Sequence, residues 1–166
     1  MELKPIDVII ETPKGNRQKY HYDEKSRIIS LKKILPQGMV FPFDFGFLPG
    51  TKGEDGDPLD ILVISELISF PGCQQACRLI GGLKAKQSEE KSDVKKIRND
   101  RFFAIPVLSE VYGHIETLND LPGKIMSETE QFFIQYNKIE GKKFEITGRM
   151  KPKDALKLIN ESYNGQ

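Results

Sequence analysis

The 166-residue sequence has no tryptophan and only two cysteines and two histidines. Cys73 and Cys77 could supply half of a zinc site, but such a site usually needs about four ligands. Neither His21 nor His114 stands at a familiar zinc-binding spacing. We therefore expect both cysteines to be buried free thiols near the start of a strand, as is usual in a reducing compartment.

Long apolar runs are absent as well. No stretch approaches the roughly 20 apolar residues that a membrane helix needs. The first residues, Met1–Asp7, include acids and a proline, and no apolar signal segment follows them. We expect a cytoplasmic protein with no membrane contact.

The sequence also lacks a large net charge, which is +1 at pH 7. A protein with balanced charge has no overall electrostatic field that attracts nucleic acids. An anion-binding site must therefore come from local clusters of Lys and Arg. An OB-type nucleic-acid binder with stacking phenylalanines in the segment 41–47 is the less favoured alternative. Alternation places those rings on one face as core, and the basic footprint is missing, so we expect no nucleic-acid partner.

What the sequence does contain is turn residues, with ten prolines and fourteen glycines. They separate short apolar or alternating runs that are typical of strands. The charged stretch 84–101 is expected to be a solvated, mobile surface loop. Strands followed mainly by helices predict one α+β domain, residues 1–166, with a small barrel as its core. The predicted strands are 6–11, 19–22, 27–31, 59–64, 76–83, 102–108 and 143–149.

Two helices are predicted in the last third of the chain. Ser127 and Glu130 form a capping-box pattern, so the first helix is expected to begin there and to stop near Gly141. Pro152 is expected to open the second helix. The side chains expected to face inward are Phe132, Phe133, Tyr136 and Ile139, then Ala155, Leu156, Ile159 and Tyr163.

Three carboxylates stand within six residues in Asp55–Asp60 (DGDPLD), just before an apolar run. Carboxylates held this close raise one another's pKa unless a cation neutralises them. Solvated turn acids would explain Asp55 and Asp57, but Asp60 inside an apolar run needs a partner. Mg²⁺, or Mn²⁺ as a substitute, prefers oxygen ligands and would supply that partner. The sequence therefore predicts a metal site here.

This segment resembles the D-G-D-P-x-D signature of the family I soluble inorganic pyrophosphatases, and the chain looks like a divergent member. The segments Val8–Pro13, Lys19–Tyr20 and Phe41–Phe47 and the helix with Tyr136 follow in the family's order. The resemblance covers nearly the whole chain. It implies a five-stranded OB-like β-barrel with two C-terminal helices packed alongside, and a Mg²⁺-dependent hydrolase that splits diphosphate into two phosphates. It also implies a homo-oligomer, with a hexamer favoured.

The resemblance implies roles for single residues. Asp55 and Asp60 would bind metal, and Asp57, also among the metal ligands, would take the proton from the attacking water. Glu11 matches a supporting acid near the metals. Lys19 and Tyr136 match residues that hold phosphate oxygens.

The chain departs from the family pattern at several of these positions. His21 stands where the family has a metal-facing Glu. Lys33 replaces a substrate-binding Arg and loses its bidentate fork. Phe41 and Phe45 replace tyrosines, and Asn137 replaces a Lys.

Further departures fall in the stretch 84–101. Arg101 replaces a substrate-binding Lys, and Gln87 and Asn99 replace two metal-binding aspartates. Asp100 is one residue out of register, and a bulge could turn it toward the metals. Other substitutes in this stretch are Glu89, Glu90 and Asp93. With fewer carboxylates we expect a slow or metal-altered enzyme. The alternative is a homologue without turnover that binds a phosphorylated ligand or partner.

Overall fold

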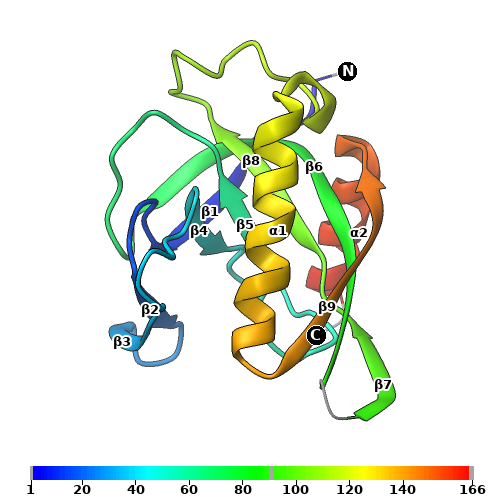
Figure 1. The fold of residues 1–166 in the computed structure, drawn as a ribbon. Helices are drawn as coiled ribbons and strands as arrows, with labels where there is room; N and C mark the ends of the chain where they lie inside the picture. The colour runs from blue at the N-terminus through cyan, green and yellow to red at the C-terminus, as the bar shows by residue number, and fades with distance from the viewer. Residues whose placement is uncertain (1, 90–91, 165–166) are drawn as a thin grey trace.

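The computed structural model describes residues 2–89 and 92–164, with strands, two α-helices and one short 3₁₀ helix (Figure 1). The strands are β1 (Ile6–Thr12), β2 (Gln18–Asp23), β3 (Ile28–Ile34), β4 (Asp44–Phe47), β5 (Asp60–Val63), β6 (Gln74–Glu89), β7 (Ser92–Arg98), β8 (Arg101–Pro106) and β9 (Lys142–Met150). The helices are η1 (Leu118–Asp120), α1 (Gly123–Ile139) and α2 (Pro152–Asn164).

Strands β1, β4, β5, β8 and β6 form a closed ring, because β6 pairs with both β8 and β1. The pairing of β5 with β8 is parallel, and the other pairings in the ring are antiparallel. The far end of β6 also pairs with β7 and β9, while β2 and β3 form a separate hairpin. The predicted α+β fold, with a closed five-stranded sheet and two helices, is confirmed.

Strand β5 runs through the middle of the molecule and is buried on both faces. Ile61 and Val63 belong to the core under α2, whereas Leu62 and Ile64 belong to the core under α1. This is the alternation expected of a strand with one apolar layer on each side. The predicted doubly buried strand is therefore confirmed, and Asp60 stands at its entrance.

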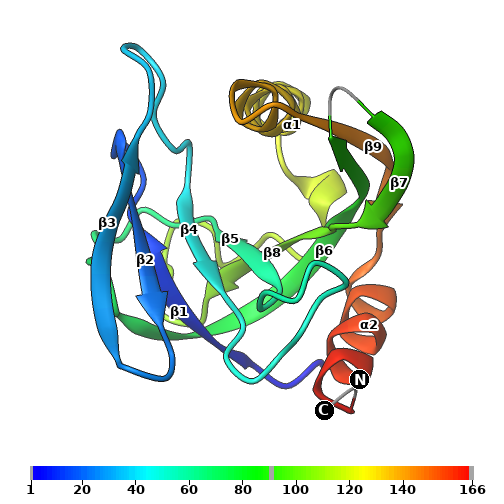
Figure 2. The ribbon, with the colours of Figure 1, turned by 90° about the horizontal axis from the view of Figure 1, so that it is seen from below.

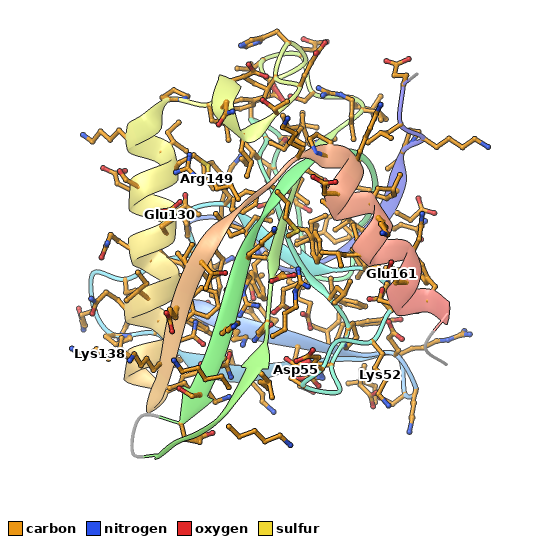
Figure 3. The ribbon with its side chains drawn as sticks, turned by 90° about the vertical axis from the view of Figure 1, so that its right-hand side faces the viewer. Lys52, Asp55, Glu130, Lys138, Arg149 and Glu161 are labelled. Atoms are coloured by element: carbon orange, nitrogen blue, oxygen red, sulfur yellow. The ribbon has the colours of Figure 1, made fainter. Side chains whose placement is uncertain are left out.

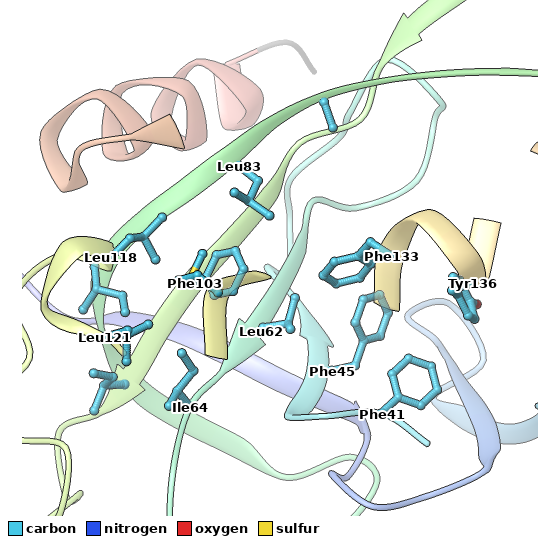
Figure 4. Packing of buried hydrophobic residues seen from close by; sticks show 14 of the residues in the cluster. Phe41, Phe45, Leu62, Ile64, Leu83, Phe103, Leu118, Leu121, Phe133 and Tyr136 are labelled. Carbon is cyan, nitrogen blue, oxygen red and sulfur yellow. The ribbon is translucent and has the colours of Figure 1, made fainter. Parts of the chain in front are cut away.

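The two helices cover different sides of the ring (Figure 2). Helix α1 contributes Phe133 and Tyr136 to one core cluster, where they lie beside Phe41 and Phe45 (Figure 4). Burying an aromatic side chain of this size contributes about 1.5–3 kcal/mol. The second cluster includes Ala155 and Ile159 of α2. The aromatic cluster therefore holds α1 beside the strands that carry the site residues.

The stretch 84–101 is not the expected surface loop. Strand β6 continues to Glu89, and β7 returns antiparallel to it, with Lys86 opposite Arg98. Along this part of β6, Lys84 and Lys86 are exposed while Ala85 and Gln87 are buried. The charged side chains lie on the solvent side of a strand whose exposed and buried residues alternate. The high content of charged residues made this alternation hard to recognise in the sequence. Glu90 lies outside the described residues, as does the side chain of Asp93.

Helix α1 begins at Gly123, after Pro122, and not at Ser127 as predicted. The hydroxyl of Ser127 donates a hydrogen bond to the carbonyl oxygen of Lys124 at 3.1 Å, within the helix. A proline favours the start of a helix, and Pro122 outcompetes the capping pattern further along the chain. The helix ends at Ile139, near the predicted stop, but Ile139 is 56% exposed and not inward-facing.

The second helix begins at Pro152, as predicted, with Ala155 and Ile159 fully buried. Both cysteines are free, and Cys77 is buried near the start of β6 as predicted, whereas Cys73, just before β6, is only partly buried. Within residues 2–89 and 92–164, neither helix has the length and apolar character needed to cross a membrane.

Candidate active site

A cavity of ≈ 160 Å³ collects residues from the ring, the β2–β3 hairpin and the end of α1. Segments far apart in the sequence meet here. The end of α1 and the start of β9 lie at the cavity together with the ring strands and the hairpin (Figure 1). Acidic, basic and amide side chains all contribute to its lining. The polar lining residues are Glu11, Lys19, His21, Tyr22, Asp55, Asp57, Asp60, Gln87, Asn99, Arg101, Tyr136, Asn137, Glu140 and Lys142.

The loop before β5 is closed by hydrogen bonds of its own. The buried hydroxyl of Thr51 donates to the carbonyl oxygen of Leu48 at 2.6 Å and accepts from the backbone N–H of Leu59 at 2.9 Å. Within the loop, the backbone N–H of Gly53 donates to the carbonyl oxygen of Asp57 at 2.8 Å. These bonds fix the path that brings the acidic residues to the cavity.

Asp55, Asp57 and Asp60, the acids of the metal site predicted from the sequence, all line the cavity. The backbone N–H of Asp57 donates to Asp55 Oδ1 at 3.0 Å, an Asx turn between the first two acids. Gly56 between them has φ +87°, a conformation that glycine adopts without strain. Burial raises the pKa of Asp55, and the nearby Asp57 carboxylate raises it further. Figure 3 labels Asp55 on this loop.

Asp60 makes an ion pair with Arg101, whose Nη1 lies 2.9 Å from Asp60 Oδ2. Burial raises the pKa of Asp60, while the Arg101 guanidinium acts in the opposite direction. Arg101 is itself 4% exposed and lies over the rings of Phe133 and Phe144, 5.3 and 5.1 Å from their centroids. The partner that Asp60 needs is therefore supplied in this structure by a guanidinium.

Hydrogen bonds extend this ion pair to the two amides that replace the expected aspartates. Arg101 Nη1 donates to Asn99 Oδ1 at 2.6 Å, and Asn99 Nδ2 donates to Gln87 Oε1 at 2.7 Å. Gln87, Asn99 and Arg101 all line the cavity, on β6, between β7 and β8, and at the start of β8. Together with Asp60 they form one chain of hydrogen bonds, which we call the amide–guanidinium network.

Asp100 does not line this cavity. Its Oδ1 accepts from the backbone N–H of Ala85 at 3.0 Å, and its Oδ2 pairs with Arg98 Nε at 2.6 Å. Asn99 and Arg101 line the cavity on either side of it in sequence, so Asp100 points the other way. Asp100 lines a neighbouring cavity of ≈ 290 Å³ together with Asp55, so the structure does not place this predicted metal ligand in the cavity that Asp55, Asp57 and Asp60 share.

Glu11 and His21 form a pair at the edge of the cavity. Glu11 Oε2 accepts from the backbone N–H of Tyr22 at 2.7 Å and lies 3.1 Å from His21 Nδ1. Burial raises the pKa of Glu11 and the carboxylate of Asp60 raises it further, while the Tyr22 N–H bond and the nearby His21 and Lys19 lower it. The pair joins β1 to the β2–β3 hairpin and so positions Lys19.

A basic side of the cavity faces these acids. Lys19 Nζ donates to the hydroxyl of Tyr136 at 2.5 Å. Lys33 does not line the cavity, but its Nζ contacts the carboxylate of Glu140 and lies 4.6 Å from the centroid of the Tyr136 ring. Burial lowers the pKa of Lys33, and with the charges of Lys19 and Lys142 brings it to about 8.

Three of the substituted positions have structural contacts instead of free polar groups. Phe41 and Phe45 are buried, with ring centroids 5.4 Å apart, and Phe41 also packs against Tyr136. Asn137 lines the cavity, but its Nδ2 donates to the carbonyl oxygen of Phe133 at 2.8 Å, one turn back in α1. The burial of Phe41, Phe45 and Phe47 also leaves these rings unavailable for stacking on bases.

Three polar lining residues were not predicted from the sequence: Tyr22, Glu140 and Lys142. A signal for Glu140 was present, because it stands four residues after Tyr136 and falls on the same side of the helix end. Lys142 follows two residues later, at the first position of β9.

Comparison with known proteins agrees with this geometry. Residues 8–165 match the family described as Inorganic pyrophosphatase. The chain belongs to the inorganic pyrophosphatase family.

Relatives and solved structures support this assignment over nearly the whole chain. An inorganic pyrophosphatase of Geobacillus stearothermophilus is 37% identical, with 99% of this chain and 98% of the relative covered. One of Synechocystis is 33% identical over 94% of this chain and 88% of the relative. The crystal structure of the Thermus thermophilus inorganic pyrophosphatase superposes with a TM-score of 0.86 at 30% identity, covering 97% of this chain and 90% of that one. The identities fit a divergent member of the pyrophosphatase family.

Proposed function

We propose that this chain hydrolyses inorganic diphosphate to two phosphates with the help of divalent cations. The observation that carries the proposal is the meeting of Asp55, Asp57 and Asp60 with Lys19 and Tyr136 at one cavity in a chain of the pyrophosphatase family. An acidic side and a basic side on one cavity suit a substrate made of charged oxygens and the cations that accompany it.

The donor chemistry fits Mg²⁺, with Mn²⁺ as a substitute. Asp55, Asp57, Asp60 and Glu11 offer only carboxylate oxygens, the ligands that these hard cations prefer. Within residues 2–89 and 92–164, no three His, Cys, Asp or Glu side chains are already gathered as a metal cluster. Asp55 and Asp60 would hold the cation, which when bound neutralises charge and acts as a Lewis acid. Because amides stand at positions 87 and 99 in place of the expected aspartates, the site has fewer carboxylates to bind the cation.

The chain's own residues would then position the reactants. Asp57 is exposed at the cavity and would accept a proton from the attacking water at a carboxylate oxygen. The Lys19 ammonium and the Tyr136 hydroxyl, already hydrogen-bonded to each other, would donate to phosphate oxygens. Arg101 would hold Asp60 in place and offer positive charge to the substrate. In such phosphoryl transfer, positioning and charge neutralisation provide most of the rate enhancement.

Phosphate release from diphosphate, measured with Mg²⁺ and then with Mn²⁺, tests the proposal. Asp57→Asn should reduce kcat at least 100-fold, the range expected for loss of a positioned base. Glu54→Gln is the matched control, because it removes one negative charge from the same loop. The glutamine amide oxygen in this variant can still accept the hydrogen bond that Glu54 receives from the backbone N–H of Arg98 at 2.7 Å. Absence of turnover in the unaltered chain with both metals would refute the hydrolase function.

A second candidate function is favoured by the amide–guanidinium network. Because Asp60 is already paired with Arg101, the site could bind a phosphorylated ligand without turning it over. Saturable diphosphate binding with no phosphate release would support this function, whereas turnover that depends on Asp57 would exclude it as the main one.

A further inference from the structure

The ammonium of one lysine on the basic side of the cavity, Lys142, has neither an ion pair nor a hydrogen bond among the described residues. Arg101 pairs with Asp60, Lys33 contacts Glu140, and Lys19 bonds to the Tyr136 hydroxyl. Lys142 lines the cavity, yet its ammonium makes no ion pair or hydrogen bond with any residue in 2–89 and 92–164. Glu89 stands opposite Lys142 across the β6–β9 pair, but no ion pair joins their side chains among the described residues, so an anionic ligand can still pair with the half-buried Lys142 ammonium.

The sheet register fixes the direction in which Lys142 points. On β9, Phe144 is directly opposite Gln87 of β6, and both are on the cavity side: Gln87 lines it, and Phe144 faces the guanidinium of Arg101. Side chains two residues apart on a strand share a face. Lys142 therefore points to the same side as Phe144, whereas the exposed Lys143 points to the opposite side.

Lys142 is the first residue of β9 and is separated from the end of helix α1 by only Glu140 and Gly141. At the far end of β9, Arg149 Nη2 forms an ion pair with Glu130 Oε1 of α1 at 2.9 Å (Figure 3). Lys142 is close enough to Lys33 for its charge to lower the pKa of Lys33. Lys19, Lys33 and Lys142 therefore lie near one another. Glu140 contacts Lys33 in this group.

We propose that Lys142 is a substrate-binding residue that donates to the phosphate group of diphosphate lying farther from Asp57. The inference rests on the proposed function, because it takes diphosphate as the ligand. The helix residue beside Tyr136 contributes no charge here, because it is the neutral Asn137. Its amide N–H donates to the backbone carbonyl of Phe133 in α1. Lys142 supplies that charge from the neighbouring strand. An ammonium on a flexible stem can follow the phosphate as a point charge with three donors.

Binding and turnover are measured separately. Diphosphate binding with Mg²⁺ is titrated by calorimetry in the Asp57→Asn background, where hydrolysis does not interfere. Adding Lys142→Met should weaken binding about tenfold, the loss expected for one charge-assisted hydrogen bond. Adding Lys143→Met removes the same charge one residue along β9 and should leave binding within about twofold. In the chain with Asp57 intact, Lys142→Met should raise KM about tenfold with a smaller change in kcat, and Lys142→Arg should recover most of the loss.

Each outcome decides the assignment. Equal binding by the Lys142→Met and Lys143→Met variants would overturn it, as would absence of any diphosphate binding. Tenfold weaker binding in Lys142→Met, in a protein that releases no phosphate, would confirm Lys142 as a ligand-binding residue while the proposed hydrolysis fails.

Discussion

Removing the guanidinium of Arg101 should destabilise the protein in a way that depends on pH. Arg101→Met keeps an unbranched side chain of similar length between the rings of Phe133 and Phe144, but leaves the carboxylate of Asp60 without its cation. Breaking a buried ion pair by removing one partner costs about 3–5 kcal/mol. Asp60 keeps 23% exposure of its side chain, so we expect the lower end, about 3 kcal/mol at pH 7.

The sign of the pH effect follows from the pKa of Asp60. Burial already raises this pKa in the folded state, so folding stability falls as pH rises from the unfolded pKa through the folded one. Loss of Arg101 removes the influence that lowers the pKa and therefore moves it further up. The stability deficit of Arg101→Met should be largest near neutral pH. Below the unfolded pKa of Asp60 it should shrink to about 1 kcal/mol, the cation–π and packing loss.

Urea denaturation in metal-free buffer at a series of pH values measures this difference. A double-mutant cycle with Asp60→Asn isolates the pair, and the coupling energy should be about 2 kcal/mol at pH 7 and near zero at low pH. For a domain of this size the deficit at pH 7 corresponds to a lower Tm by about 6–12 °C. A deficit that stays constant with pH, or a coupling energy near zero at pH 7, would show that the pair does not stabilise the fold.

Two further predictions concern single positions. Gly46→Ala would place a Cβ 2.3 Å from the carbonyl oxygen of Ile9 and should cost about 2–3 kcal/mol in urea denaturation. Gly148→Ala, with nothing within 4 Å, should change stability by less than about 0.5 kcal/mol; similar losses in both variants would contradict the clash. Asn99→Asp adds a carboxylate beside the cavity and should tighten Mg²⁺ binding roughly three- to tenfold in calorimetry. Unchanged or weaker affinity would show that this position lies outside the metal site.

The fold could be predicted from the sequence where one signal dominated. The apolar run after Asp60 indicated a buried strand, and Pro152 indicated the start of a helix. The predictions failed where two signals competed. In the stretch 84–101 the charged residues outweighed a period of two, and at the start of α1 the Ser127 pattern concealed the effect of Pro122.

The acidic part of the site could be predicted because it lies in one short segment. Asp55, Asp57 and Asp60 needed only a turn to reach the same cavity. The fate of Asp100 was already implied by strand alternation, because it stands between two residues that point inward. Lys142 could not be predicted, because its place in the cavity depends on pairing between β6 and β9, which are separated by most of the second half of the chain.

The amide–guanidinium network shows why substitutions in a site need to be considered together. Taken one at a time, Gln87 and Asn99 each look like the loss of a metal ligand. In the structure Asn99 accepts from Arg101 and donates to Gln87, so its amide uses both of its hydrogen-bonding functions, and Gln87 accepts through Oε1. A carboxylate at position 99 could only accept, and Gln87 would then lose its donor. The three residues around Asp60 are therefore one unit, and changes to its members should combine non-additively.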